Sequence, residues 1–391
     1  MATIQVESAG WRVWGMVAAL ALARVAFGFQ LQTVASLGPV LLGEFHMGYA
    51  MLGTLIGLYM LPGALVAIPI GLMARSTGDR FIIGLGIAIM ALGSSWSAGA
   101  VGPPGIGAGR VIAGCGAVAL TVLQGKILSD RLSGVRFTYA LSALVGAFPI
   151  GIGLAQLLQG SLAARFGWPG AFLFGSGMAL VPLGLLLACW TDPPVAAPRN
   201  WAWPTRRETA LVVISGLIWT AYNAAYGNFL GYVPTLLAAR HHPRWVTDVV
   251  MTLATWGNLP AVLLGGVLAA RVGRTLVFVS GTIWTVTVVF GMAATNYPLV
   301  WGVLFGTLAS LHGGLIIEMG TLSARPESRA VGMGMFYTTY YLGGAMLPAI
   351  CGKAADLAGT PAGALVAAAS ISMLALPLYW LHRDVSHPRD A

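Results

Sequence analysis

An arginine lies deep inside the first long apolar stretch of the chain. Arg24 follows about 12 residues of that stretch, so a helix would place it about 18 Å along its axis, near the middle of a membrane. A charge at that depth costs about 2.5–3.5 kcal/mol on insertion scales. A guanidinium suits paired hydrogen bonds to a carboxylate-like group. We therefore predict that Arg24 binds an anionic group of a small-molecule substrate. The alternative is that it donates to helix carbonyls in a packing contact.

Arg110 is a second basic residue within an apolar stretch. It lies about two turns inside a predicted span, and Thr121 and Gln124 continue a narrow polar line along the same helix face. We count Arg110 as a second candidate for substrate binding, with a bracing role between helices as an equal alternative.

Four polar aromatic and amide residues share one helix face. Trp219, Tyr222, Asn223 and Tyr226 follow the spacing i, i+3, i+4, i+7 and lie at the depth of Arg24. Rings with hydroxyl, indole and amide groups suit an apolar pocket with a few placed polar atoms. We predict that this face binds substrate, with aromatic packing between helices as the alternative.

Two titratable residues occupy one predicted span, 298–322. Glu318 is the one acid well inside a span, and His312 would lie about 9 Å from it along a helix. Both are candidates for coupling or gating, with the proton as the candidate coupling ion. The alternative for Glu318 is a gating ion pair with Arg271, Arg325 or Arg329. So few buried acids would leave a cavity positive and unsuited to cations.

The composition indicates that these residues are positioned by membrane helices. Apolar residues make up 57% of the 391-residue chain and charged residues 8%, against roughly 25% charged in soluble domains. We predict an all-α membrane protein with twelve transmembrane helices. The expected spans are 12–41, 48–74, 80–100, 105–129, 137–164, 170–190, 208–237, 246–270, 275–294, 298–322, 329–352 and 361–382.

Two turns recur about 195 residues apart. Residues 71–80 resemble 266–274, and residues 160–169 resemble 352–361. Such a repeat predicts two six-helix bundles related by pseudo-twofold symmetry, which would rock about a site between them. The expected domains are an N-terminal bundle (1–190), a cytoplasmic linker (191–207) and a C-terminal bundle (208–391). The turns also supply four candidate gating residues: Arg75, Asp79, Arg80 and Arg271.

The basic residues predict the orientation of the spans. With the N-terminus inside, fifteen of the 21 Lys and Arg residues fall on the cytoplasmic side. We therefore expect cytoplasmic N- and C-termini in a plasma membrane or bacterial inner membrane. The net charge of +9 then reflects topology, and no nucleic-acid partner is expected. No ATP-binding loop or metal-ligand spacing occurs, so we predict no cofactor, no metal and no enzymatic activity. Nothing in the sequence requires an oligomer.

The turns and one span resemble motifs of the major facilitator superfamily. Gly71, Gly78, Asp79 and Arg80 are similar to the loop signature of that family, with Arg75 where the family has Asp. The stretch from Arg110 to Gly116 is similar to its R-x-x-x-G-x-G pattern, and Gly167, Trp168 and Phe172 are similar to its G-W-R-x-x-F passage. The resemblance implies two six-helix bundles around a cavity lined by spans 1, 4, 7 and 10. It extends loosely to a branch of small-anion importers that includes cyanate transporters.

Together these features predict a secondary transporter that moves a small anionic solute by alternating access. The alternative is a carrier of a neutral or apolar compound, efflux included, in which Arg24 is structural. Whether Asp79 replaces the motif Asp missing at Arg75 stays open, as do the substrate and the direction of transport.

Overall fold

The structure is a computed structural model that describes residues 10–191 and 202–386, and these residues form helices and no strands. The first seven helices are α1 (Trp11–Ser36), α2 (Gly38–Phe45), α3 (Tyr49–Gly57), α4 (Leu61–Thr77), α5 (Asp79–Ala98), α6 (Pro103–Ser129) and α7 (Gly134–Cys189). The next nine are α8 (Arg206–Ala239), α9 (Arg244–Trp256), α10 (Asn258–Val272), α11 (Arg274–Ala294), α12 (Pro298–Leu308), α13 (Gly313–Leu322), α14 (Arg329–Ala358), α15 (Ala362–Met373) and α16 (Ala375–Ser386).

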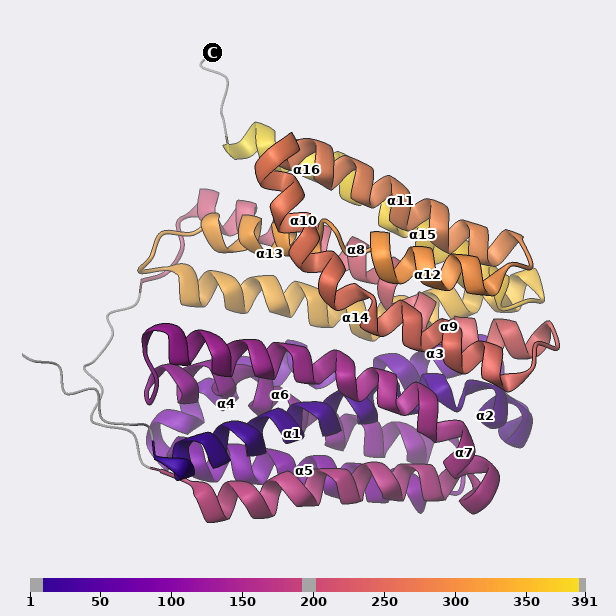
Figure 1. Ribbon diagram of the computed structural model, residues 1–391, viewed down its shortest axis with the longest axis horizontal. Coiled ribbons are helices and arrows are strands. Elements are labelled where there is room, and N and C mark those ends of the chain that lie inside the picture. The colour runs from indigo at the N-terminus through magenta and orange to yellow at the C-terminus, as the bar shows by residue number, and fades with distance from the viewer. Residues whose placement is uncertain (1–9, 192–201, 387–391) are drawn as a thin grey trace, which may run out of the picture.

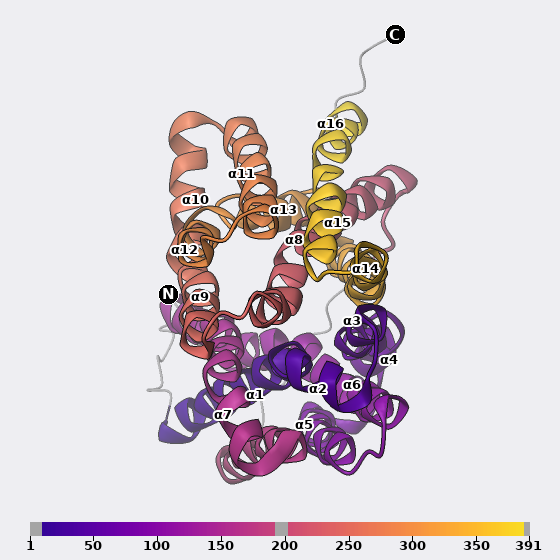
Figure 2. The same cartoon turned by 90° about the vertical axis from the view of Figure 1, so that its right-hand side faces the viewer.

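The helices form two bundles, α1–α7 and α8–α16, which lie side by side in Figures 1 and 2. We call the end where α1 and α8 begin the linker end, and the end where they finish the distal end. Figure 1 has the linker end on its left, and Figure 2 looks onto the distal end. The expected division into two six-span bundles is confirmed, while the exact domain limits stay a prediction because residues 192–201 lie outside the described part.

The prediction of twelve spans holds once helix breaks are taken into account. Ten stretches of the described chain are long and apolar enough to cross a membrane. The longest, α7, contains two spans joined at Gly167, and the 30-residue α14 completes the twelve. Five expected continuous spans were wrong in detail, because each is divided into two helices: 12–41, 48–74, 246–270, 298–322 and 361–382. Pro39 at the start of α2 explains the first break, since its ring removes a backbone donor.

The repeated turns have matching backbone conformations in the two halves. Gly78 and Gly273 have φ of 87° and 98°, and Gly167 and Gly359 have φ of 71° and 66°. Only glycine enters this region without a Cβ penalty, so each turn requires its glycine. The internal repeat predicted from the sequence is thus present in the fold.

The two bundles are packed backbone to backbone in their distal halves. A Cβ on Gly53 of α3 would lie 2.0 Å from the carbonyl oxygen of Pro348 in α14, and one on Gly57 would lie 2.1 Å from that of Ala345. The carboxylate of Asp356 accepts hydrogen bonds from the backbone N–H groups of Tyr49 (2.7 Å) and Ala50 (3.0 Å) at the start of α3. An acid at a helix N-terminus is favoured by its free N–H groups. Asp356 therefore fastens one bundle to the other at this end.

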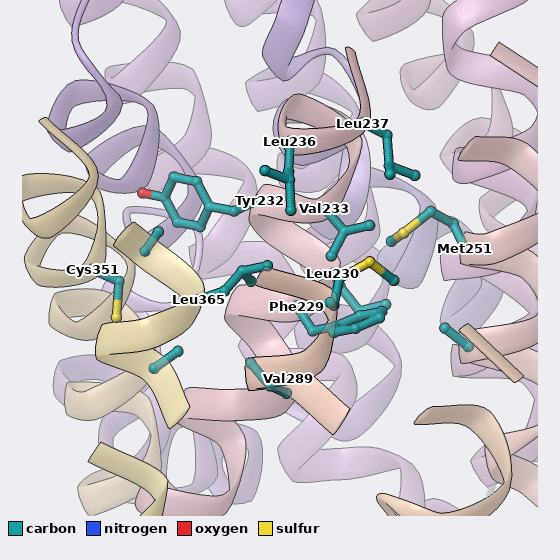
Figure 3. Close-up of a cluster of buried hydrophobic side chains, with 14 of the residues drawn as sticks. Phe229, Leu230, Tyr232, Val233, Leu236, Leu237, Met251, Val289, Cys351 and Leu365 are labelled. Atoms are coloured by element: carbon teal, nitrogen blue, oxygen red, sulfur yellow. The ribbon is translucent and has the colours of Figure 1, made fainter. Parts of the chain in front are cut away.

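Helix α8 runs through the middle of the largest buried apolar cluster. Figure 3 shows its residues from Phe229 to Leu237 packed against neighbouring helices. Phe229 stacks on Phe305 of α12 at 3.8 Å between ring centroids, and the Tyr232 hydroxyl lies 2.7 Å from the carbonyl oxygen of Pro348. This packing fixes the position of α8. The predicted aromatic face, residues 219–226, lies on the same helix nearer the linker end and is positioned with it.

Candidate functional site: a central cavity between the bundles

A cavity of about 710 Å³ lies between the two bundles. Helices α1, α3 and α7 line it on one side, and α8, α10, α13 and α14 line it on the other. Leu141, Leu263 and Ile317 of its lining lie in the linker-end halves of spans 137–164, 246–270 and 298–322. None of the described lining residues is Asp, Glu, Lys, Arg or His. The cavity wall is therefore apolar, with uncharged polar groups placed in it.

Helix α8 begins at a capping box, which sets its register. The Thr205 hydroxyl accepts from the Glu208 backbone N–H (3.3 Å), and the Glu208 carboxylate accepts from the Thr205 backbone N–H (2.7 Å). Glu208 also accepts from the Arg325 guanidinium at 2.8 Å, and this hydrogen bond raises the pKa of Arg325. The start of α8 is thus fastened to the turn before α14.

The four residues predicted on one face of α8 all line the cavity. Trp219 and Tyr222 stack with 5.1 Å between ring centroids, and Tyr222 and Tyr226 with 6.1 Å. The Tyr222 hydroxyl lies 2.7 Å from the Ser310 hydroxyl, and Asn223 donates to the Trp219 carbonyl at 2.8 Å. The structure brings this set together as expected, and its role in binding substrate stays a prediction.

Arg24 lies behind the cavity wall rather than on it. Its guanidinium donates to the Thr121 hydroxyl of α6 at 3.1 Å and sits over the rings of Phe27 and Phe148, at 5.1 and 5.0 Å. Phe148 lines the cavity, so Arg24 contacts one of the rings that form the cavity wall. The Nε of Arg24 is buried without a hydrogen-bond partner in the described structure.

Arg110 is buried in the N-terminal bundle, 2% exposed, away from the cavity lining. Its guanidinium donates to the carbonyls of Leu55 (3.1 Å) and Ile56 (3.3 Å) in the last turn of α3. It also donates to those of Gln30 (2.5 Å) and Leu31 (3.0 Å) in α1. The break after Gly57 leaves the final carbonyls of α3 without intrahelical donors, and Arg110 supplies them. These contacts fit the bracing alternative.

His312 lies at a break in span 10, between α12 and α13. Its ring is 1% exposed and packs edge-on against Tyr222 and Phe278, at 5.0 and 5.6 Å between centroids. Its unpartnered Nδ1 lies against Gly281 of α11, where a Cβ would be 2.6 Å away. The break at residues 309–312 divides the expected span 298–322, but residues 313–318 belong to α13 and follow His312 directly. The expected spacing of His312 and Glu318 along one helix is therefore compatible with the break.

Two of the candidate gating residues, Asp79 and Glu318, form ion pairs at the linker end. Asp79 pairs with Lys126 at 2.5 Å. Glu318 pairs with Arg274 at 2.7 Å, so the three partners expected for it, Arg271, Arg325 and Arg329, were wrong. Arg274 begins α11 and Arg271 lies near the end of α10, so the packing of these two helices decides which arginine reaches α13. The sequence does not fix that packing.

The other two residues of the first turn stay outside any pair described here. Arg80 donates to the Leu187 carbonyl at 3.4 Å. The side chain of Arg75 lies outside the described part of the structure. Whether Asp79 replaces the missing motif acid therefore stays a prediction.

The structure adds cavity residues to the binding set predicted from the sequence. Asn228 is 2% exposed and lines the cavity five residues beyond Asn223. Tyr340 of α14 also lines it, and Ser310 supports Tyr222 from behind. The sequence could have pointed to Asn228, because it is a polar amide in the same apolar stretch as Asn223.

Comparison with known proteins agrees with this architecture. A sequence profile described as Major Facilitator Superfamily matches residues 20–243, more than half of the chain. The chain belongs to the major facilitator superfamily. As a member it is a multi-pass membrane transporter, in line with the expectation of no enzymatic activity. The narrower resemblance to cyanate transporters stays a prediction.

Individual members of this superfamily resemble the chain over most of its length. The inner membrane transport protein YajR of Escherichia coli (strain K12) is 24% identical over 344 residues, which cover 84% of this chain and 74% of YajR. A bacterial homologue of the human lysosomal transporter Spinster, in an inward-facing and unoccupied conformation, has a TM-score of 0.79 with 16% identity, over 97% of this chain and 98% of that one. A mutant of the nucleoside transporter NupG has a TM-score of 0.73 with 13% identity, over 95% and 100%.

Proposed function

We propose that this protein is a secondary transporter that moves a neutral, largely apolar solute through the central cavity by alternating access. The observation that carries the proposal is the lining of the cavity, in which no described residue is charged and three aromatic rings of α8 stack in a row. An apolar wall with few polar groups favours a neutral solute, because an anion would lose its hydration without gaining a counter-charge.

The packing between the bundles supports the alternating-access part of the proposal. The distal halves are in backbone contact, while the cavity lining continues toward the linker end. With the termini cytoplasmic, as the basic residues predict, this conformation would face inward. A rocking motion would separate α3 from α14 and close the linker end. The proton stays the candidate coupling ion, with Glu318 and His312 as the groups that could carry it.

A small anion is the second candidate substrate, and Arg24 is the observation that favours it. Its Nε has no partner, and rotation of one ring, Phe148, would expose the guanidinium to the cavity. In this version Arg24 would bind the anion, as the sequence alone suggests.

The two candidate substrate classes, neutral and anionic, can be distinguished with two ligands that share one ring system and differ in charge. Purified protein in detergent is titrated with 2-naphthol, which is neutral at pH 7, and with 2-naphthoate, which is an anion. The neutral proposal expects 2-naphthol to bind the wild type and Arg24→Ala within twofold of each other, and to bind Trp219→Ala at least tenfold more weakly. Binding of 2-naphthoate alone, lost by about 30-fold or more in Arg24→Ala, would replace the proposal with the anion candidate.

A further inference from the structure

The two bundles face each other along two sides of the cavity, and one side is closed by direct packing. There α4 meets α14, and a Cβ on Gly63 would overlap the ring of Tyr341. A Cβ on Gly344 would lie 2.6 Å from the Sδ atom of Met60. At 1.5 Å per residue, Gly63 and Tyr341 lie about 20 Å from the linker-end tips of α4 and α14. The cavity is therefore closed on this side at that depth.

On the other side α7 faces α10, and the corresponding contact is missing. We call residues 141–149 of α7 and 258–263 of α10 the α7–α10 seam. Nearer the distal end the same two spans touch, because a Cβ on Gly153 would overlap the indole of Trp256. In the seam, a Cβ on the cavity-lining Gly146 would meet no described heavy atom within 4 Å. Figure 1 shows α10 and the first half of α7 diverging toward the linker end, with α14 visible between them.

The internal repeat explains why the two sides differ. Tyr341 lies eleven residues before Gly352, and Pro149 lies eleven residues before Gly160, which is its counterpart in the repeat. Both intervals belong to single helices, α14 and α7, so the repeat places Tyr341 and Pro149 at equivalent positions. The tyrosine ring that closes the α4–α14 side is thus replaced by the smaller proline ring in the seam.

Side chains of the seam belong both to the cavity wall and to the outer surface. Val145 and Leu263 line the cavity, yet they are 59% and 75% exposed. Both lie about 15 Å from the linker-end tips of their helices, within reach of a hydrocarbon layer about 30 Å thick. None of the seam residues is charged. An apolar solute that moved between the lipid and the cavity at this point would pass no charged group.

We infer that the α7–α10 seam is a lateral portal, through which an apolar solute dissolved in the membrane enters the cavity without passing through water. The inference rests on the proposed neutral-solute function and adds the source from which the solute is taken. Apolar compounds leave water for the bilayer, because burial of apolar surface is favourable. Their concentration beside the seam is therefore higher than at the aqueous linker end.

The test compares two thiol reagents that reach the cavity by different routes. The three native cysteines are replaced by alanine, and Asn223→Cys supplies a thiol at a partly exposed position of the cavity wall. In lipid nanodiscs, pyrene maleimide arrives from the lipid and a cationic methanethiosulfonate reagent arrives from water. Pro149→Tyr and Gly146→Trp are two independent plugs of the seam. Leu180→Trp is the matched control, because this exposed position of α7 is outside the described lining.

Each plug is expected to slow pyrene maleimide by about tenfold, as for an added barrier of about 1.4 kcal/mol, and to leave the cationic reagent nearly unaffected. The control variant should change neither rate. Unchanged pyrene maleimide rates in both plugged variants would overturn the inference and leave the proposed function standing, as would equal slowing of both reagents.

Two further outcomes also count against the portal. Failure of pyrene maleimide to label the unplugged protein would indicate that a resident lipid chain fills the seam, and would overturn the inference alone. Failure of 2-naphthol to bind the wild type would overturn the proposed function and this inference with it.

Discussion

The two bundles handle polarity in opposite ways. The N-terminal bundle holds two arginines within its spans, Arg24 and Arg110, and directs them at a hydroxyl, aromatic rings and backbone carbonyls. The C-terminal bundle faces the cavity with uncharged tyrosines, asparagines and a tryptophan, some of which have unpartnered atoms. The comparison teaches that a buried charge can be held by rings, a hydroxyl and carbonyls inside one bundle. We therefore expect uncharged polar groups on the cavity wall to indicate the binding site better than a buried charge does.

The largest expected effect tests the bracing role of Arg110. Arg110→Leu should lower the free energy of unfolding by about 3 kcal/mol, because it removes charge-assisted hydrogen bonds to four carbonyls where no water can replace them. Arg24→Leu removes one bond to a hydroxyl and should cost about 1 kcal/mol. Denaturant unfolding in mixed micelles measures both. Similar losses for the two variants would remove the distinction drawn between these arginines.

A second prediction concerns the joint between the bundles. Asp356→Ala removes two hydrogen bonds to the start of α3 and should weaken closure of the distal end by about 1–2 kcal/mol, the usual size of a lost helix cap. Asp356→Asn keeps one acceptor and should have a smaller effect. Spin-label distances across the distal end report the population of the open state. An unchanged distance distribution in Asp356→Ala would show that the glycine contacts alone hold the joint.

A smaller effect is expected at the aromatic face of α8. Tyr222→Phe removes the hydroxyl paired with Ser310 and should weaken binding of 2-naphthol by about 0.5–1.5 kcal/mol, mainly by loosening the stack. Tyr232→Phe is the matched control, because Tyr232 is not among the described lining residues and its hydroxyl contacts the carbonyls of Tyr49 and Pro348 in the joint between the bundles. Its binding should stay at the wild-type level. A greater loss in the control would place the important hydroxyl outside the cavity.

The smallest effects come from the repeated turn, which carries opposite charges in the two halves. Asp79 follows Gly78 and is 8% exposed, whereas Arg274 follows Gly273 and its side chain is 66% exposed. An acid suits a helix N-terminus and a base does not. Asp79→Ala should therefore cost about 1 kcal/mol of stability, and Arg274→Ala less than about 0.5 kcal/mol. Thermal unfolding of the two variants under one condition compares them, and the reverse order would contradict the argument.

The helical periodicity of the sequence was sufficient to predict the fold and one wall of the site. The four residues on α8 share a face through local geometry alone, and the repeated turns depend on glycines that are visible in the chain. The helix breaks were harder, since residues 58–60 and 309–312 leave the helix through contacts made by distant elements. Partners of single side chains were the least predictable. Thr121 and Phe148 surround Arg24 only because α6 and α7 pack around α1 in one particular rotation.

The two arginines of the N-terminal bundle have a consequence for the membrane potential. No described Asp or Glu forms an ion pair with Arg24 or Arg110, so the bundle carries two uncompensated positive charges within its spans. Moving one charge through a fifth of the membrane field changes the energy by about 0.5 kcal/mol per 100 mV. Rocking of this bundle would shift both charges together. The cycle should therefore respond to voltage even when the transported solute is neutral.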